Sequence, residues 1–109
     1  MAKEPLDIVR ALCHAHADVT ERRSHGEPTW FVCGKRSFVM FADRHHDDRV
    51  ACWCAAPPGA QEAYVASDPE RYFRPPYVGV RGWVGVYLDV AVDWPEVAAI
   101  VAAAYDLRK

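Results

Sequence analysis

Residues 72–89 of this 109-residue chain read YFRPPYVGVRGWVGVYLD. The second half of the segment, residues 82–89, has the period of a β-strand, in which successive side chains point to opposite faces of a sheet. One face would carry Val84, Val86 and Leu88, and the other would carry Trp83, Gly85 and Tyr87. Pro75-Pro76 cannot continue a helix and therefore marks a loop before the strand. The segment predicts a strand with one aliphatic and one aromatic face.

Three further strands are predicted upstream at residues 29–33, 37–42 and 49–55, the first two because β-branched and aromatic residues are concentrated there, and the polar segment before them leaves room for a short strand around 19–24. Gly34-Lys35 suits a tight hairpin, since Gly34 can adopt a positive φ. Alternation along 49–55 separates two sets, Val50, Cys52 and Cys54 on one face and Ala51, Trp53 and Ala55 on the other. Both faces of 29–33 and 37–42 are apolar, so periodicity leaves their buried face open.

Helices are predicted at both ends of the chain and between the last two strands. Apolar residues recur at helical spacing over residues 5–16, with Pro5 in the first turn. A helix is expected after Pro57-Pro58, through about residue 66, with Ala60, Ala63 and Tyr64 inward. A second, short helix would start at Ser67, which could cap it while Glu70 reaches back to Ser67, and would end before Pro75.

The clearest helix boundary is Asp93-Trp94-Pro95-Glu96, which has the form of a capping box with proline in the first turn. An apolar stripe follows and would face the core. The order of helix, several strands, two helical segments, strand and helix predicts an α+β fold. Its simplest arrangement is an antiparallel sheet with helices packed on one face.

Length and composition place limits on the protein class. A chain of 109 residues fits a single domain spanning 1–109. The net charge of −2 and the pI of about 6.2 argue against a strongly basic polyanion binder, but they leave room for a local basic patch. No apolar run suggests a signal peptide or membrane span, so we expect a cytoplasmic protein with free thiols at its four cysteines. It would be a monomer or weak homodimer.

Residues 24–38 and 73–88 are similar in sequence to the MmcQ/YjbR family, and the similarity covers nearly the whole chain. The shared pieces are Ser24-His25-Gly26 with Pro28, Gly34-Lys35, the Pro-Pro-Tyr-Val-Gly run, Gly82-Trp83-Val84-Gly85 and Trp94 opening the last helix. This resemblance implies a small bacterial protein with a CyaY/frataxin-like fold. Family members carry a DNA-binding description, and the family supplies no catalytic residues to transfer.

The aromatic face predicted for residues 82–89 suggests nucleic-acid binding. If helices cover the Val84 face, Trp83 and Tyr87 would lie on the uncovered face, where Trp53 or Trp30 could join them. Rings flanked by arginines are used to stack unpaired bases. The candidate residues for DNA or single-stranded nucleic acid are Arg22, Arg23, Lys35, Arg36, Arg74, Tyr77, Arg81, Trp83 and Tyr87.

Two other interpretations of the same segment stay open. The same face could dock a protein partner or a flat small ligand, because Trp, Tyr and Arg dominate protein interfaces. Alternatively, the segment is structural, with Tyr72 and Phe73 closing the sheet edge and Pro75-Pro76 stiffening a loop. A steep salt dependence of binding would favour phosphate, and its absence would favour a protein.

Metal and catalytic sites are not expected. Cys52 and Cys54 share a strand face, and His14, His16, His45 and His46 offer imidazoles, but the spacing does not match a zinc motif. The best catalytic pair is His25 with Glu27, with Cys33 as a nearby thiol, and it falls in a turn-like segment. We therefore expect a non-enzymatic protein without a cofactor.

Overall fold

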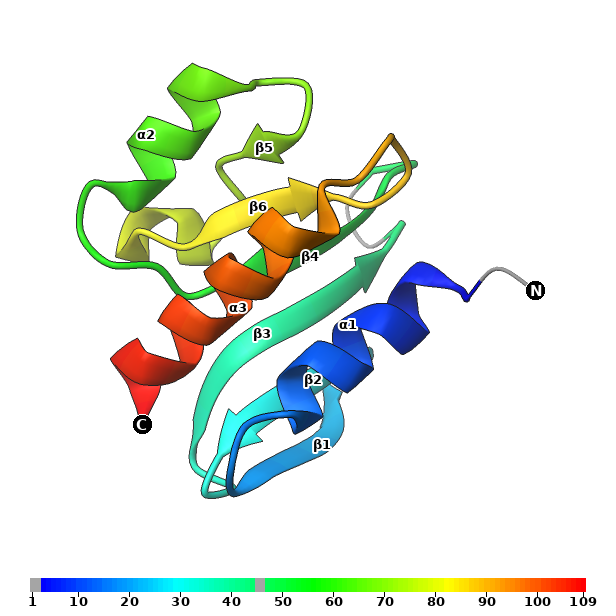
Figure 1. Cartoon of the computed structure of the whole chain (residues 1–109), viewed down its shortest axis with the longest axis vertical. Coiled ribbons are helices and arrows are strands. Elements are labelled where there is room, and N and C mark those ends of the chain that lie inside the picture. Colours follow the sequence, from blue (N-terminus) through cyan, green and yellow to red (C-terminus); the bar gives the residue numbers. More distant parts are fainter. Residues whose placement is uncertain (1–2, 45–46) are drawn as a thin grey trace.

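The computed structural model describes residues 3–44 and 47–109, so the predicted loop residues His45 and His46 lie outside the described part. Six strands form one antiparallel sheet in the order β1-β2-β3-β4-β6-β5 (Figure 1). The strands are β1 (Val19–Ser24), β2 (Glu27–Val32), β3 (Arg36–Asp43), β4 (Val50–Cys54), β5 (Tyr72–Phe73) and β6 (Val84–Tyr87).

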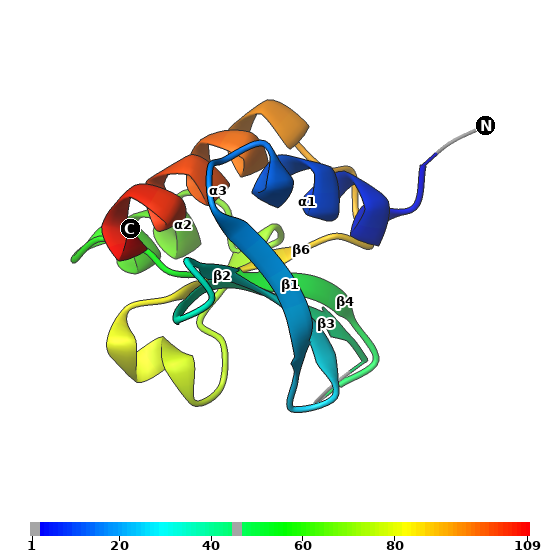
Figure 2. The same cartoon turned by 90° about the horizontal axis from the view of Figure 1, so that it is seen from below.

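The helices gather on one side of this sheet. They are α1 (Pro5–His14), α2 (Ala60–Ser67) and α3 (Trp94–Arg108), whereas the short 3-10 helix η1 (Val78–Arg81) lies on the other side. Figure 2 shows α1 and α3 above the sheet and the yellow-green segment around η1 hanging below it. The predicted α+β fold, with an antiparallel sheet and helices on one face, is confirmed.

The aliphatic face predicted for the last strand is also confirmed. Val84, Val86 and Leu88 are all at most 4% exposed and belong to the core beneath the helices. Cys52 and Cys54 of β4 are fully buried in the same core, where Cys13 of α1 meets them. Burial raises the pKa of the Cys13 thiol well above its usual range, so this thiol stays protonated and serves as a small apolar filler.

Local sequence signals account for the ends of the long helix and for the hairpins. The Asp93 carboxylate accepts a hydrogen bond from the Glu96 amide at 3.2 Å, as the capping sequence predicts. Between β2 and β3, Cys33 and Gly34 both have positive φ, at 54° and 69°. This is the backbone of a type I′ turn. The turn therefore centres on Cys33-Gly34, one residue earlier than the predicted Gly34-Lys35 pair.

The prediction of a second helix from Ser67 is wrong. Residues 72–73 instead form β5, an edge strand that pairs with β6. Of the inward positions predicted for α2, Ala60 and Tyr64 pack against the core, but Ala63 is exposed and Gln61 is buried in its place. Gln61 points inward because its amide donates to the carbonyls of Gly79 and Trp83, at 2.9 and 2.5 Å. A buried amide stays favourable when its hydrogen bonds are satisfied in this way.

Candidate nucleic-acid interface

The sheet face that points away from the helices carries one row of side chains across all six strands. The pairing partners along this row are Arg22, Thr29, Met40, Trp53, Gly85 and Phe73. The ring of Phe73 lies directly on Gly85, where an added Cβ would come within 2.3 Å of the ring. The gap that Gly85 leaves is therefore filled by the chain itself and is not open to a base.

Tyr87, a candidate stacking residue, is also covered. Its ring stacks on Phe73 with the centroids 4.4 Å apart, and the Arg49 guanidinium lies 3.7 Å above it. Arg49 is fixed there by two hydrogen bonds to Asp89, at 2.8 and 2.9 Å. This pairing holds the pKa of the Asp89 carboxyl below its usual range.

The expectation that Trp83 faces water is wrong. Trp83 is 4% exposed and belongs to the core, because it precedes β6 and does not follow the alternation of the strand. Trp53 is 5% exposed beneath Phe73 and Pro76, which line a small hollow with it. Trp30 is fully buried and faces the opposite side of the sheet. The tryptophans proposed for base stacking are thus not available on the surface.

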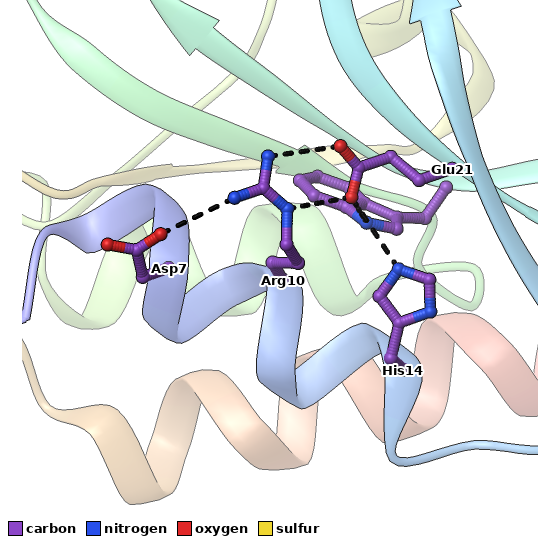
Figure 3. A network of polar contacts seen from close by, with 5 residues as sticks. Asp7, Arg10, His14 and Glu21 are labelled. Carbon is purple, nitrogen blue, oxygen red and sulfur yellow. Dashed lines mark hydrogen bonds and ion pairs between the residues drawn. The ribbon is translucent and has the colours of Figure 1, made fainter.

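Trp30 belongs instead to a polar network between α1 and β1 (Figure 3). The Glu21 carboxylate accepts hydrogen bonds from the Trp30 indole at 2.9 Å and from the Arg10 guanidinium at 2.8 and 3.0 Å. His14 lies 3.5 Å from the same carboxylate. The Arg10 guanidinium is the main cause that lowers the pKa of Glu21, and the Trp30 hydrogen bond adds to it. The network connects α1 to the sheet and leaves Glu21 ionised.

The loop before β6 presents the exposed candidates. Tyr77 is 75% exposed, and its neighbour Val80 is 78% exposed. Arg74, before η1, and Arg81, the last residue of η1, are both exposed, and the Arg74 side chain lies over Gly79. The Gln61 hydrogen bonds from α2 fix this loop in place. From Arg71 to Leu88 the chain contains three arginines and no acidic residue.

Strand register brings other cations to the same end of the sheet. β3 begins at Arg36, and it runs antiparallel to β4, so Arg36 lies at the end where β4 finishes and β6 starts. Arg108, near the end of α3, donates to the Ser37 carbonyl at 3.0 Å. In Figure 1 the C-terminus of α3 and the coil of η1 lie on the same side of the molecule, opposite the N-terminus. We refer to Lys35, Arg36, Arg81 and Arg108 as the basic end.

Burial is the main cause that lowers the pKa of Arg108, and the neighbouring charges of Arg81 and Arg36 lower it further. The guanidiniums of Arg36 and Arg81 therefore both lie within electrostatic reach of Arg108. Sequence analysis singled out Arg36 and Arg81 but missed Arg108, whose only local signal is a basic residue in the last turn of a helix.

The remaining candidates lie in different places. Arg22 is exposed near the basic end, where its guanidinium lies 3.7 Å above the Phe31 ring and donates to the Gly34 carbonyl at 3.0 Å. Arg23 donates to the Gly26 carbonyl at 2.6 Å, in the turn at the opposite end of the sheet. Arg23 is thus separated from the other cations, whereas Arg22 can add to them.

Carboxylates dominate the opposite end of the sheet, where β3 ends and β4 begins. We refer to Glu4, Asp43, Asp47, Asp48 and Asp89 as the acidic end. A groove of about 430 Å³ lies there, with Leu6, Phe41, Val50 and Leu88 among its lining residues. The net charge of −2 therefore conceals an uneven distribution of charge along the strands, although Asp18 and Asp106 lie near the basic end.

Other site types have less support among the described residues. Within residues 3–44 and 47–109, no three His, Cys, Asp or Glu side chains gather as a metal ion would require. The Sγ atoms of Cys52 and Cys54 are 3.9 Å apart in the core. The Glu27 carboxylate accepts from the Asp43 amide at 2.5 Å, while His25 is exposed in a turn with φ of 54°. None of the described helices combines the length and apolar character needed to cross a bilayer.

Comparison with known proteins agrees with this architecture. The profile of the YjbR family matches residues 14–107. The chain belongs to the YjbR family. The fold of this YjbR protein is similar to the crystal structure of Deinococcus radiodurans protein DR2400, which has a DUF419 domain. The two share a fold with a TM-score of 0.76 at 17% identity, over 94% of this chain and 76% of that one. A comparison with curated proteins finds no significant match.

Proposed function

We propose that this YjbR protein is a non-enzymatic module that binds nucleic acid through its basic end and the adjoining loop of residues 74–82. The observation that carries the proposal is the uneven distribution of charge. Arg36, Arg81 and Arg108 gather from three elements, and carboxylates concentrate at the opposite end. Such a patch attracts phosphates even on a chain with net negative charge.

The loop supplies the features that the sheet face lacks. Tyr77 is the exposed ring of the segment, and Arg74 and Arg81 lie on either side of it in sequence. An exposed ring between cations can stack on an unpaired base while guanidiniums contact the backbone. We therefore assign base stacking to Tyr77 and no longer to Trp83 and Tyr87. With one ring, we expect stacking to contribute about 1–3 kcal/mol and affinity to be modest.

We propose that the protein acts in the cytoplasm, because all four cysteine thiols are free and three of them are buried, which fits a reducing compartment. A non-enzymatic role is supported by the engagement of the best catalytic candidates. Glu27 is used as a hydrogen-bond acceptor for the backbone of β3, and His25 occupies a turn position with positive φ. Both roles are structural.

Fluorescence anisotropy with labelled single- and double-stranded oligonucleotides tests the proposal. We expect the logarithm of the association constant to fall linearly with the logarithm of the salt concentration. The double variant Arg36→Gln/Arg81→Gln should weaken binding and reduce the slope for duplex DNA by about 1.8, since each phosphate contact contributes about 0.9. Tyr77→Ala should weaken binding to single strands more than to duplex.

A matched control is available at the opposite end of the molecule. Lys3→Gln/Arg44→Gln removes the same charge from exposed positions and should leave binding nearly unchanged. Equal loss in both double variants would mean that net charge alone governs binding, and the proposed interface would be wrong. An affinity that does not change with salt concentration would indicate a protein partner instead.

A further inference from the structure

The fold determines where the arginines at the basic end lie. The Arg108 Nε donates to the carbonyl of Ser37 at 3.0 Å, which fixes this half-buried guanidinium beside the start of β3. The preceding residue, Arg36, is exposed at the same strand end. One arginine is therefore held by the fold, and a second is free to move toward a ligand beside it.

Arg81 joins these two from the other side of the sheet end. The next residue, Gly82, packs against Ala56, whose carbonyl oxygen would lie 3.9 Å from an added Cβ. The neighbouring Ala55 amide donates to the Phe38 carbonyl at 2.9 Å, one residue beyond Ser37. Through these contacts, the end of η1 lies against the strand end where Arg36 and Arg108 meet.

Among the residues that the structure describes, 3–44 and 47–109, no carboxylate forms an ion pair with Arg36, Arg81 or Arg108. Asp106, the acidic residue nearest in sequence to Arg108, pairs with Lys109 at 3.2 Å. Arg36 and Arg81 thus stand near Arg108 with no ion-pair partner among the described residues, and an anion that contacts all three would be attracted to them.

We infer that the cluster of Arg36, Arg81 and Arg108 binds a phosphate monoester dianion, such as the terminal phosphate of a nucleic-acid strand, in preference to an internal phosphodiester. This inference rests on the proposed function and specifies its ligand. A phosphate monoester carries about −1.5 to −2 charge near neutral pH. A phosphodiester carries a single charge. Three guanidiniums with planar donor forks fit the dianion better in both charge and number of donors.

The test compares oligonucleotides that differ only at one end. A short single strand, labelled at the far end, carries a terminal phosphate, a hydroxyl or a methyl phosphodiester, at either the 5′ or the 3′ end. We expect the phosphorylated strand to bind about tenfold more tightly than the hydroxyl strand, as one further charge-assisted hydrogen bond would give. The methyl diester should bind less tightly than the phosphate monoester, because it carries a single charge and lacks the second.

Variants of the chain distinguish binding at this cluster from nonspecific electrostatic attraction. In Arg81→Gln the preference for the phosphorylated end should fall to about one, while Arg81→Lys should retain part of it. Arg44→Gln, at the acidic end, should keep the full preference. If Arg108→Gln unfolds the chain by freeing the Ser37 carbonyl, Arg81→Gln still decides the outcome.

The outcomes distinguish the inference from the proposed function. Equal binding of all three ends by the native protein would overturn the inference and leave nucleic-acid binding intact. Binding of a nucleoside monophosphate, with no added affinity for a longer strand, would support the phosphate site and contradict the proposed function. Failure to bind any of these probes would overturn both.

Discussion

At Gly85 the missing side chain allows the Phe73 ring to lie flat against the sheet. An added Cβ would come within 2.3 Å of the ring, far inside van der Waals contact. The same ring then stacks on Tyr87 and covers Trp53 together with Pro76. One glycine therefore determines whether the aromatic face of the sheet is closed by the chain or open to a ligand.

Gly85→Ala should therefore destabilise the protein by displacing Phe73. We expect the free energy of unfolding, measured by urea denaturation, to fall by about 1–3 kcal/mol, as for other overpacked sites. In a Phe73→Leu background the same change should cost less, because the smaller side chain can move aside. A neutral Gly85→Ala would show that Phe73 does not occupy this position.

Trp83 shows the limit of reasoning at the residue scale. Alternation along β6 correctly placed Val84 and Val86 in the core, yet it misplaced Trp83, which lies just before the strand starts. Period two holds only while the backbone is extended. At the strand boundary, the hydrogen bond from Gln61 to the Trp83 carbonyl and the surrounding packing determine the direction of the ring.

Among the elements, α1 and β1 depend on a single carboxylate for their polar contact. Glu21 accepts from Arg10 of α1 and from Trp30 of β2, and its pKa lies below the ordinary value of 4.5. The folded chain therefore binds a proton at Glu21 less readily than the unfolded chain does. The stabilisation from Glu21 is complete above its unfolded pKa and is lost as the pH falls through the folded pKa.

Glu21→Gln should remove this part of the acid sensitivity. At about pH 6 the variant should be less stable than the native chain, and the difference should shrink as the pH falls toward about 3. Chemical denaturation at several pH values measures both free energies. Glu4→Gln serves as the control at an exposed carboxylate. A difference that stays constant with pH would show that Glu21 is not linked to folding through its charge.

At the scale of the whole molecule, charge is arranged along the strand direction. β3 starts with Arg36 and ends with Asp43, and the antiparallel partners place Arg81 and Asp89 at the matching ends. The chain should therefore bind a polyanion at one end despite its pI of about 6.2.

Heparin chromatography tests this polarity without nucleic-acid bases. At about pH 7.5 and low salt we expect retention of the native chain, because a local patch acts within roughly one Debye length, about 10 Å at 0.1 M salt. Arg36→Gln/Arg81→Gln should elute at lower salt. Lys3→Gln/Arg44→Gln should elute like the native chain, and identical shifts for both would contradict the polarity.

The sequence by itself determined the features that neighbouring residues set. Alternation in residues 49–55 and 82–89 indicated the strands, the Asp93 carboxylate marked the start of α3, and the motifs of the family identified the fold. Each of these signals depends on a few neighbouring residues, so it can be recognised in the sequence alone. The error at residues 67–73 arose because β5 forms only by pairing with β6, a contact that local propensity does not contain.

Only the tertiary structure decided which side chains meet. It buried Trp83, placed the Phe73 ring on Gly85, and brought Arg108 from the last turn of α3 to Arg36 and Arg81. Arg36 and Arg108 are far apart in the chain, and nothing near either residue signals the other. Their proximity follows from the register of the sheet and the packing of α3 across it, because long-range contacts depend on how whole elements bury their apolar faces.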